Sequence, residues 1–271
     1  MNYFRCGGSE KVTIDGEKVM DKMELYSNMP KGIQLSEAPY TFVGIDTQVV
    51  IYNDEIHILG GRTAAQYRYH YKWDGTTWTQ LSDLPYNFSR GVAVVYHDEI
   101  HIFGSVINEN KRKHYKWDGT TWTQLSDFPS EYGVARASAV VYNNEIHILS
   151  GYAIYSNNSS DTSSSHYKWD GTTWTQLSDL PWSIGDCSAV VYDGCINVYG
   201  NSAHSYKWDG TTWTQLSDIP YNVYINYGVA IEYMGKINIF GDESSSNKTR
   251  QSVIETPLYV SIPSAILGIY V

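Results

Sequence analysis

The chain has 271 residues, and its 24 Tyr and 9 Trp residues favour strands. A closed array of repeats of this length commonly forms one unit, so we expect a single domain over residues 1–271. A formal net charge of −10 argues against nucleic acid as a partner, because phosphate-binding surfaces need clustered Lys and Arg. No segment is apolar over enough residues to span a bilayer, so we expect no membrane insertion.

The start of the chain shows no apolar secretory stretch. We therefore expect a cytoplasmic protein, or one exported by a route that the sequence does not reveal. The cysteines are Cys6, Cys187 and Cys195, and no Cys-x-x-Cys pair occurs. A turn at Asp193-Gly194 would leave Cys187 and Cys195 out of register, so we expect free thiols. We expect neither a metal nor another cofactor.

An apolar hairpin is the first complete unit along the chain. At residues 49–61, two runs of strand-forming residues flank Asn53-Asp54, a pair that suits a two-residue hairpin turn. We call the two strands of this hairpin a and b. Equivalent hairpins follow at residues 93–104, 139–151, 189–200 and 230–241.

A nearly identical phrase follows each of the first four hairpins: His-Tyr-Lys-Trp-Asp-Gly-Thr-Thr-Trp-Thr-Gln-Leu-Ser-Asp, then an apolar residue and Pro. It occupies residues 70–85, 114–129, 166–181 and, with Ser205 in first place, 205–220. Its Asp-Gly predicts a turn between a strand c and a strand d. Each repeat of roughly forty to fifty residues is therefore expected to be a four-stranded antiparallel meander.

Such a sheet cannot bury both faces alone, so neighbouring repeats must stack, and radial closure removes the exposed edges. The sequence therefore predicts an all-β propeller. Its motifs resemble those of the kelch-repeat family, to which the central domain of galactose oxidase is similar. The motifs are Gly60-Gly61 after strand b, Tyr71 and Trp78 separated by six residues, and Arg90 at the head of the next strand a. The resemblance implies kelch-like blades.

The two ends of the chain suggest how the ring closes. Residues 221–263 are interpreted as a fifth, degenerate repeat, and residues 264–271 as one more strand a. Three N-terminal segments resemble strands b, c and d: residues 2–8, 11–16 and 22–30. We therefore predict six blades, with strands within residues 1–39 completing the closing blade together with residues 264–271. The alternative is five blades with residues 1–39 as a cap.

Three histidines recur at one position of strand b: His57, His101 and His147. A metal ion could bind such side chains. Strand b is second from the propeller axis, however, so histidines of different blades should lie too far apart to share one ion. We therefore expect structural hydrogen bonds here. The Trp-Asp-Gly-Thr-Thr-Trp segments are likewise expected to serve turn geometry and packing between blades.

Function on a repeated scaffold usually resides in its variable loops. The d-to-a and b-to-c connections should emerge on the same face, and both carry aromatic rings beside Asn, Asp and Arg. Such surfaces suit sugar or peptide recognition, because rings supply apolar area and polar neighbours fix orientation. The candidate ligand-binding residues are Arg62, Tyr86, Arg90, Tyr132, Arg136, Trp182 and Tyr224.

We therefore expect a non-catalytic module that binds a carbohydrate or protein ligand. The alternative is a sialic-acid-type sugar epimerase or a glycosidase. In that interpretation Arg62, Arg90 and Arg136 bind a carboxylate, as an arginine cluster does in sialidases, and a kelch propeller of similar size is a sialic-acid epimerase. No paired carboxylates and no nucleophile–base pair support this alternative. A further alternative is a structural part of a bacterial or phage assembly, since the four phrases suggest recent duplication.

Overall fold

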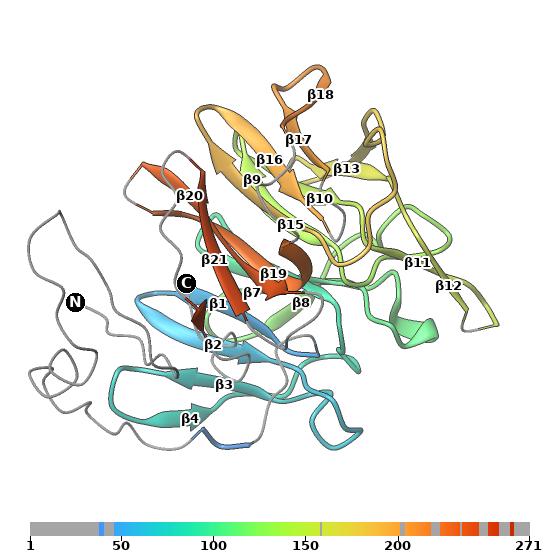
Figure 1. Cartoon of the computed structure of the whole chain (residues 1–271). Helices are drawn as coiled ribbons and strands as arrows, with labels where there is room; N and C mark the ends of the chain where they lie inside the picture. Colours follow the sequence, from blue (N-terminus) through green and yellow to red (C-terminus); the bar gives the residue numbers. More distant parts are fainter. Residues whose placement is uncertain are drawn as a thin grey trace, which may run out of the picture.

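The computed structural model describes residues 38–40, 46–157, 159–200, 204–217, 223–233, 235–243, 249–254 and 261–262. In these ranges the chain is all-β apart from one short 3₁₀ helix, Asn108–Asn110. None of the helices in this part of the chain has the length and apolarity to cross a membrane. The chain forms a β-propeller, as predicted, and its blades are arranged around a common centre (Figure 1).

Four blades have the same four-stranded antiparallel order. Blade 1 consists of β1 (Gln48–Tyr52), β2 (Glu55–Leu59), β3 (His70–Trp73) and β4 (Trp78–Gln80). Blade 2 consists of β5 (Val92–Tyr96), β6 (Glu99–Phe103), β7 (His114–Trp117) and β8 (Trp122–Gln124). Blade 3 consists of β9 (Ser138–Tyr142), β10 (Glu145–Leu149), β13 (His166–Trp169) and β14 (Trp174–Gln176). Blade 4 consists of β15 (Ser188–Tyr192), β16 (Cys195–Tyr199), β17 (Ser205–Trp208) and β18 (Trp213–Gln215).

Blade 5 follows the same order with longer inner strands. It contains β19 (Val223–Tyr233), β20 (Lys236–Glu243), β21 (Thr249–Ile254) and β22 (Ser261–Ile262). The first strands of successive blades contact one another from β1 through β5, β9 and β15 to β19, so strand a is the innermost strand. The predicted closing blade, from residues 1–39 and 264–271, lies outside the described residues except for residues 38 and 39.

The turns between strands a and b have the predicted geometry. Asn53 and Asp54 have φ values of 52° and 61°, the left-handed conformation that a two-residue hairpin turn requires. These turns also connect blades, because the Tyr that ends strand a donates its hydroxyl to the turn of the next blade. Tyr96 donates to the Asn144 carbonyl over 2.9 Å, and Tyr142 to the Gly194 carbonyl over 3.0 Å.

The repeated phrase builds the outer hairpin and the interface between blades. Asp74 Oδ1 accepts hydrogen bonds from the backbone N–H groups of Thr76 and Thr77, each over 2.8 Å, and the same contacts recur in the later copies. Trp73 and Trp78 then pack together with ring centroids 5.2 Å apart. Between blades, the indole N–H of Trp174 in blade 3 donates to the Ser126 carbonyl of blade 2 over 3.3 Å. These contacts confirm that the most repeated residues serve turn geometry and packing between blades.

A pair of buried histidines joins strands b and c in each of the first three blades. The ring nitrogens lie 2.8 Å apart in His57–His70, 3.0 Å in His101–His114 and 2.8 Å in His147–His166. Each strand c histidine also packs edge-on against a tryptophan of the next blade; the centroids of His70 and Trp117 are 5.3 Å apart. The predicted structural role of the strand b histidines is confirmed.

Candidate functional site

Both variable loop sets lie on one face of the propeller, which we call the loop face. In blade 1 the N–H of Phe88, in the d-to-a loop, donates to the Tyr67 carbonyl of the b-to-c loop over 3.0 Å. In blade 3 the N–H of Ile184 donates in the same way to the Ser163 carbonyl over 3.0 Å. The a-to-b and c-to-d turns are at the other ends of the strands. The expected clustering of the loops is therefore confirmed.

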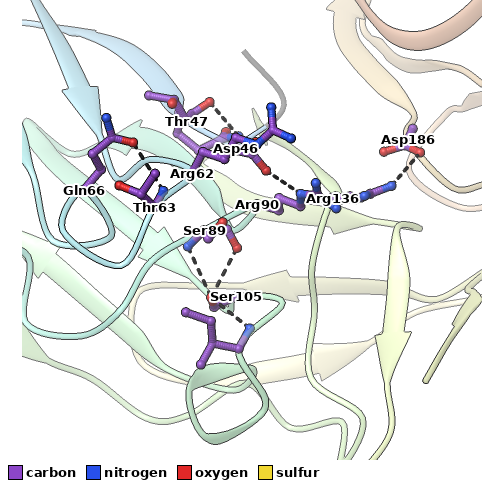
Figure 2. A network of polar contacts seen from close by, with 12 residues as sticks. Asp46, Thr47, Arg62, Thr63, Gln66, Ser89, Arg90, Ser105, Arg136 and Asp186 are labelled. Atoms are coloured by element: carbon purple, nitrogen blue, oxygen red, sulfur yellow. Dashed lines mark hydrogen bonds and ion pairs between the residues drawn. The ribbon is translucent and has the colours of Figure 1, made fainter. Parts of the chain in front are cut away.

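A row of charged side chains lies on the loop face beside the inner strands (Figure 2). Arg90 Nε lies 2.5 Å from Asp46 Oδ1, and Arg136 Nη1 lies 3.3 Å from Asp186 Oδ2. Both carboxylates are well covered, with side-chain exposures of 3% for Asp46 and 9% for Asp186. Two of the three predicted arginines are therefore paired with carboxylates from a neighbouring blade.

The charged row arises from one repeated backbone position. Asp46, Arg90, Arg136 and Asp186 each stand two residues before the inner strand of blades 1 to 4. Arg90, Arg136 and Asp186 have positive φ values of 53°, 50° and 48°. The Arg136 N–H donates to the Arg90 carbonyl over 2.7 Å, which ties adjacent positions together. The residue that sequence reasoning missed is Asp46; counting two residues back from the first strand a would have found it.

Tyr152 completes the charged row at blade 3. Its hydroxyl donates to Asp186 Oδ2 over 3.2 Å, and the Arg136 guanidinium carbon lies 5.2 Å from its ring centroid. Burial, followed by the nearby Asp186 carboxylate, raises the pKa of the Tyr152 phenol. Tyr152 begins an additional hairpin of β11 (Tyr152–Ile154) and β12 (Ser160–Thr162), which extends beyond the sheet of its blade (Figure 1).

Two predicted aromatic residues are solvent-exposed on consecutive d-to-a loops. Tyr132 is 41% exposed and Trp182 is 58% exposed. Tyr132 packs edge-to-face with Tyr155, at a centroid distance of 5.0 Å. Trp182 lies 6.1 Å from the His204 ring centroid, which leaves most of the indole open to solvent. These loops therefore present apolar rings to solvent on the loop face.

The remaining predicted residues differ in their surroundings. Arg62 is the most exposed of the three arginines, with 67% of its side chain accessible and its Nε 4.0 Å from Asp46 Oδ2. Tyr86, in contrast, is largely buried: it is 7% exposed, and its hydroxyl donates to the Gly104 carbonyl over 3.1 Å. Tyr224 lies in β19 opposite Asp242, and its side chain is outside the described part.

Metal binding and thiol chemistry find little support in the described part of the chain. Among its residues, no group of three or more His, Cys, Asp or Glu side chains could hold a metal ion. Cys187 and Cys195 are free thiols, as predicted. The Cys187 thiol lies against the Leu149 carbonyl at 3.4 Å, and burial raises its pKa to about 12. A thiol of this kind is a poor nucleophile at neutral pH.

Comparison with known proteins supports the fold. No family model matches the chain, and no curated protein matches it. Among solved structures, the one titled "Structure of YjhT" is similar, with a TM-score of 0.63 and 13% sequence identity over 80% of this chain and 83% of that chain. At this identity the likeness shows the fold alone, which is that of a β-propeller.

Proposed function

We propose that this chain is a kelch-like recognition module that binds a carbohydrate ligand on its loop face without transforming it. The observation that carries the proposal is the exposure of Tyr132 and Trp182 on consecutive d-to-a loops. Aromatic rings stack on the apolar C–H face of a sugar, and polar neighbours orient its hydroxyl groups. The paired charges of the loop face would supply those polar neighbours.

The backbone around these rings supports a preformed surface. The Tyr132 carbonyl accepts a hydrogen bond from the Ile154 N–H over 2.8 Å, and the loop of Trp182 is tied to blade 3 by the 3.1 Å bond from the Gly151 N–H to the Ile184 carbonyl. Loops held by such bonds lose little conformational entropy when a ligand binds. A ligand would therefore meet rings that are already positioned.

The alternative, a sugar-acid epimerase or a glycosidase, needs free guanidinium groups to hold a carboxylate. Arg90 and Arg136 are paired with Asp46 and Asp186, which leaves Arg62 as the most accessible of the three cations. A bidentate arginine site for a ligand carboxylate would have to displace these ion pairs. This competition favours binding of an uncharged ligand.

A glycan-array screen tests the proposal. We expect saturable binding by the wild type, and loss of that binding when Tyr132 and Trp182 are replaced by Ala. The matched control is Tyr233→Ala, because Tyr233 is 57% exposed but stands beside the a-to-b turn of blade 5, at the other end of the strands. Turnover of a carboxylate sugar that Arg90→Ala abolishes would instead support the enzyme, and a silent array would contradict carbohydrate recognition.

A further inference from the structure

The hairpin β11–β12 distinguishes blade 3 from its neighbours. The connections between the second and third strands of blades 1, 2 and 4 contain no strands in their described parts. In blade 3 this connection instead forms an additional two-stranded sheet, with Ala153 opposite Asp161. The framework of the blade does not require the hairpin, since blades 1 and 2, whose connections are fully described, form without one.

The hairpin is attached to the loop that carries Tyr132. Ala135 and Tyr152 exchange backbone hydrogen bonds of 3.3 and 2.8 Å, and the Ile154 N–H donates to the Tyr132 carbonyl over 2.8 Å. Lys111 Nζ donates to the Ile154 carbonyl over 2.7 Å, which adds a contact from blade 2. These bonds fix the two segments in register at the position where their aromatic side chains meet.

The result is a corner of two rings from different segments. Tyr132 and Tyr155 meet at an interplanar angle of 65° with their centroids 5.0 Å apart, and Tyr132 remains 41% exposed. Two rings at this angle offer one face on which a flat apolar surface can stack and a second ring that flanks it. We call these two residues the aromatic corner.

An exposed carboxylate accompanies each ring of the corner: Glu131 precedes Tyr132 in the d-to-a loop, and Asp161 lies opposite Ala153 in the hairpin that carries Tyr155. Hydrogen bonding to Glu131 raises the pKa of the Tyr132 phenol, and hydrogen bonding to Asp161 raises the pKa of the Tyr155 phenol. Lys111, whose ammonium group donates to the Ile154 carbonyl beside Tyr155, is already engaged by that backbone oxygen. Ionised carboxylates accept hydrogen bonds and repel anions, so the rim of the corner suits hydroxyl groups and disfavours a ligand carboxylate.

We propose that the aromatic corner binds one pyranose residue of a neutral glycan, with the sugar's C–H face against one tyrosine and its hydroxyl groups donating to Glu131 and Asp161. This inference rests on the proposed carbohydrate recognition and specifies its ligand class. Neutral hexoses have the apolar C–H face and hydroxyl donors that the corner accommodates. Hexuronic and sialic acids carry a carboxylate that the acidic rim would repel.

The test compares glycan binding by the wild type and four variants: Tyr155→Ala, Asp161→Asn, Trp182→Ala and Tyr233→Ala. Titration calorimetry with neutral oligosaccharides selected on an array should show binding that Tyr155→Ala weakens about tenfold, a loss typical of one stacked ring. Asp161→Asn should reduce the preference for neutral over hexuronic oligosaccharides, because the amide keeps a hydrogen-bonding oxygen and removes the charge. Tyr233→Ala should bind as the wild type does. Thermal melting checks that each variant folds.

The outcomes separate the two proposals. If a neutral glycan binds and Trp182→Ala weakens it while Tyr155→Ala does not, the loop face recognises sugars but the corner is not the site. Stronger binding of acidic than of neutral oligosaccharides by the wild type would overturn the ligand class. Absence of binding to any glycan would overturn the carbohydrate proposal and the corner with it.

Discussion

Nδ1 of His57 lies 2.8 Å from Nε2 of His70, and the second nitrogen of each ring is buried without a hydrogen-bond partner. One ring must donate and the other must accept, so the pair cannot carry a positive charge on both rings. Burial lowers the pKa of His57 to about 4 and that of His70 to about 3. Burial also lowers the pKa values of both histidines in the pairs of blades 2 and 3.

These pairs should make the fold sensitive to mild acid. A histidine of the unfolded chain takes up a proton near pH 6.5, whereas the folded pair resists it until about pH 4. The histidine contribution to stability is therefore fully present above pH 6.5 and is lost as the pH falls from 6.5 towards 4. Each such proton changes the free energy of unfolding by about 1.4 kcal/mol per pH unit. Urea unfolding at several pH values measures this slope.

The chain offers its own control for this prediction. Blade 4 has Asn197 and Ser205 where the earlier blades have histidines. Replacing His147 by Asn and His166 by Ser gives blade 3 the residue pair of blade 4. This variant should take up fewer protons on unfolding between pH 6.5 and 4. If the free energy of unfolding of the wild type does not change between pH 6.5 and 4, or if its pH dependence is the same in this variant, the histidine pairs do not control acid stability.

Arg90→Ala should destabilise the fold by leaving the Asp46 carboxylate without its closest cation. Asp46 is 3% exposed, and removing one partner of a buried ion pair costs about 3–5 kcal/mol. Because Arg90 is itself 31% exposed, we expect a smaller loss of about 2 kcal/mol. Chemical unfolding measures it, and adding Asp46→Asn should recover part of the loss. An Arg90→Ala variant as stable as the wild type would contradict this role.

Two glycines with positive φ separate backbone strain from crowding. At Gly75, with φ of 96°, an added Cβ meets nothing within 4 Å. Gly75→Ala should therefore lower the free energy of unfolding by only about 1–2 kcal/mol, the cost of placing Ala in a left-handed backbone conformation. At Gly104, with φ of 60°, the Cβ would lie 1.9 Å from the Val134 carbonyl oxygen. Gly104→Ala should therefore lower the free energy of unfolding by about 1–3 kcal/mol more than Gly75→Ala does, because the added methyl group overpacks the site. Equal melting temperatures for the two variants would be the contrary result.

Cys195→Glu should restore a cross-strand ion pair to blade 4. In blade 1, Lys72 Nζ lies 2.9 Å from Glu55 Oε1, and blades 2 and 3 have the same pair. Blade 4 has Cys195 at the Glu position, opposite the strand that carries Lys207. These side chains are partly exposed, so the gain should be about 0.5 kcal/mol and should shrink in salt. Cys195→Gln is the uncharged control; an equal gain there would exclude the ion pair as the cause.

Repetition made most of the fold predictable from the sequence. Asn53-Asp54 and Asp74-Gly75 specify turns through local backbone chemistry, and their recurrence fixes the strand order without tertiary information. The partner of His57 was not recognised, although a signal exists: the later repeat that replaces His by Asn197 in strand b also replaces His by Ser205 in strand c. That paired replacement indicates contact between the two positions.

The site was less predictable because burial in a loop depends on neighbouring blades. Tyr86 and Tyr132 occupy d-to-a loops of similar composition, but Tyr86 packs against Phe88 and Tyr115, whereas Tyr132 meets only the hairpin residue Tyr155 among described ring contacts. The pairing of Arg90 with Asp46 joins residues 44 positions apart, so no local pattern reveals it. Sequence placed these residues on one face, and tertiary contacts decided which of them meet solvent.

The most direct measurement is the dissociation constant of an array-selected glycan for Trp182→Ala beside that for Tyr233→Ala. Both substitutions remove an exposed aromatic ring, with exposures of 58% and 57%, but from opposite ends of the propeller strands. We predict that Trp182→Ala weakens binding about tenfold and that Tyr233→Ala leaves it unchanged. Equal effects of the two substitutions, or no glycan bound by the wild type, would contradict recognition of carbohydrate by the loop face.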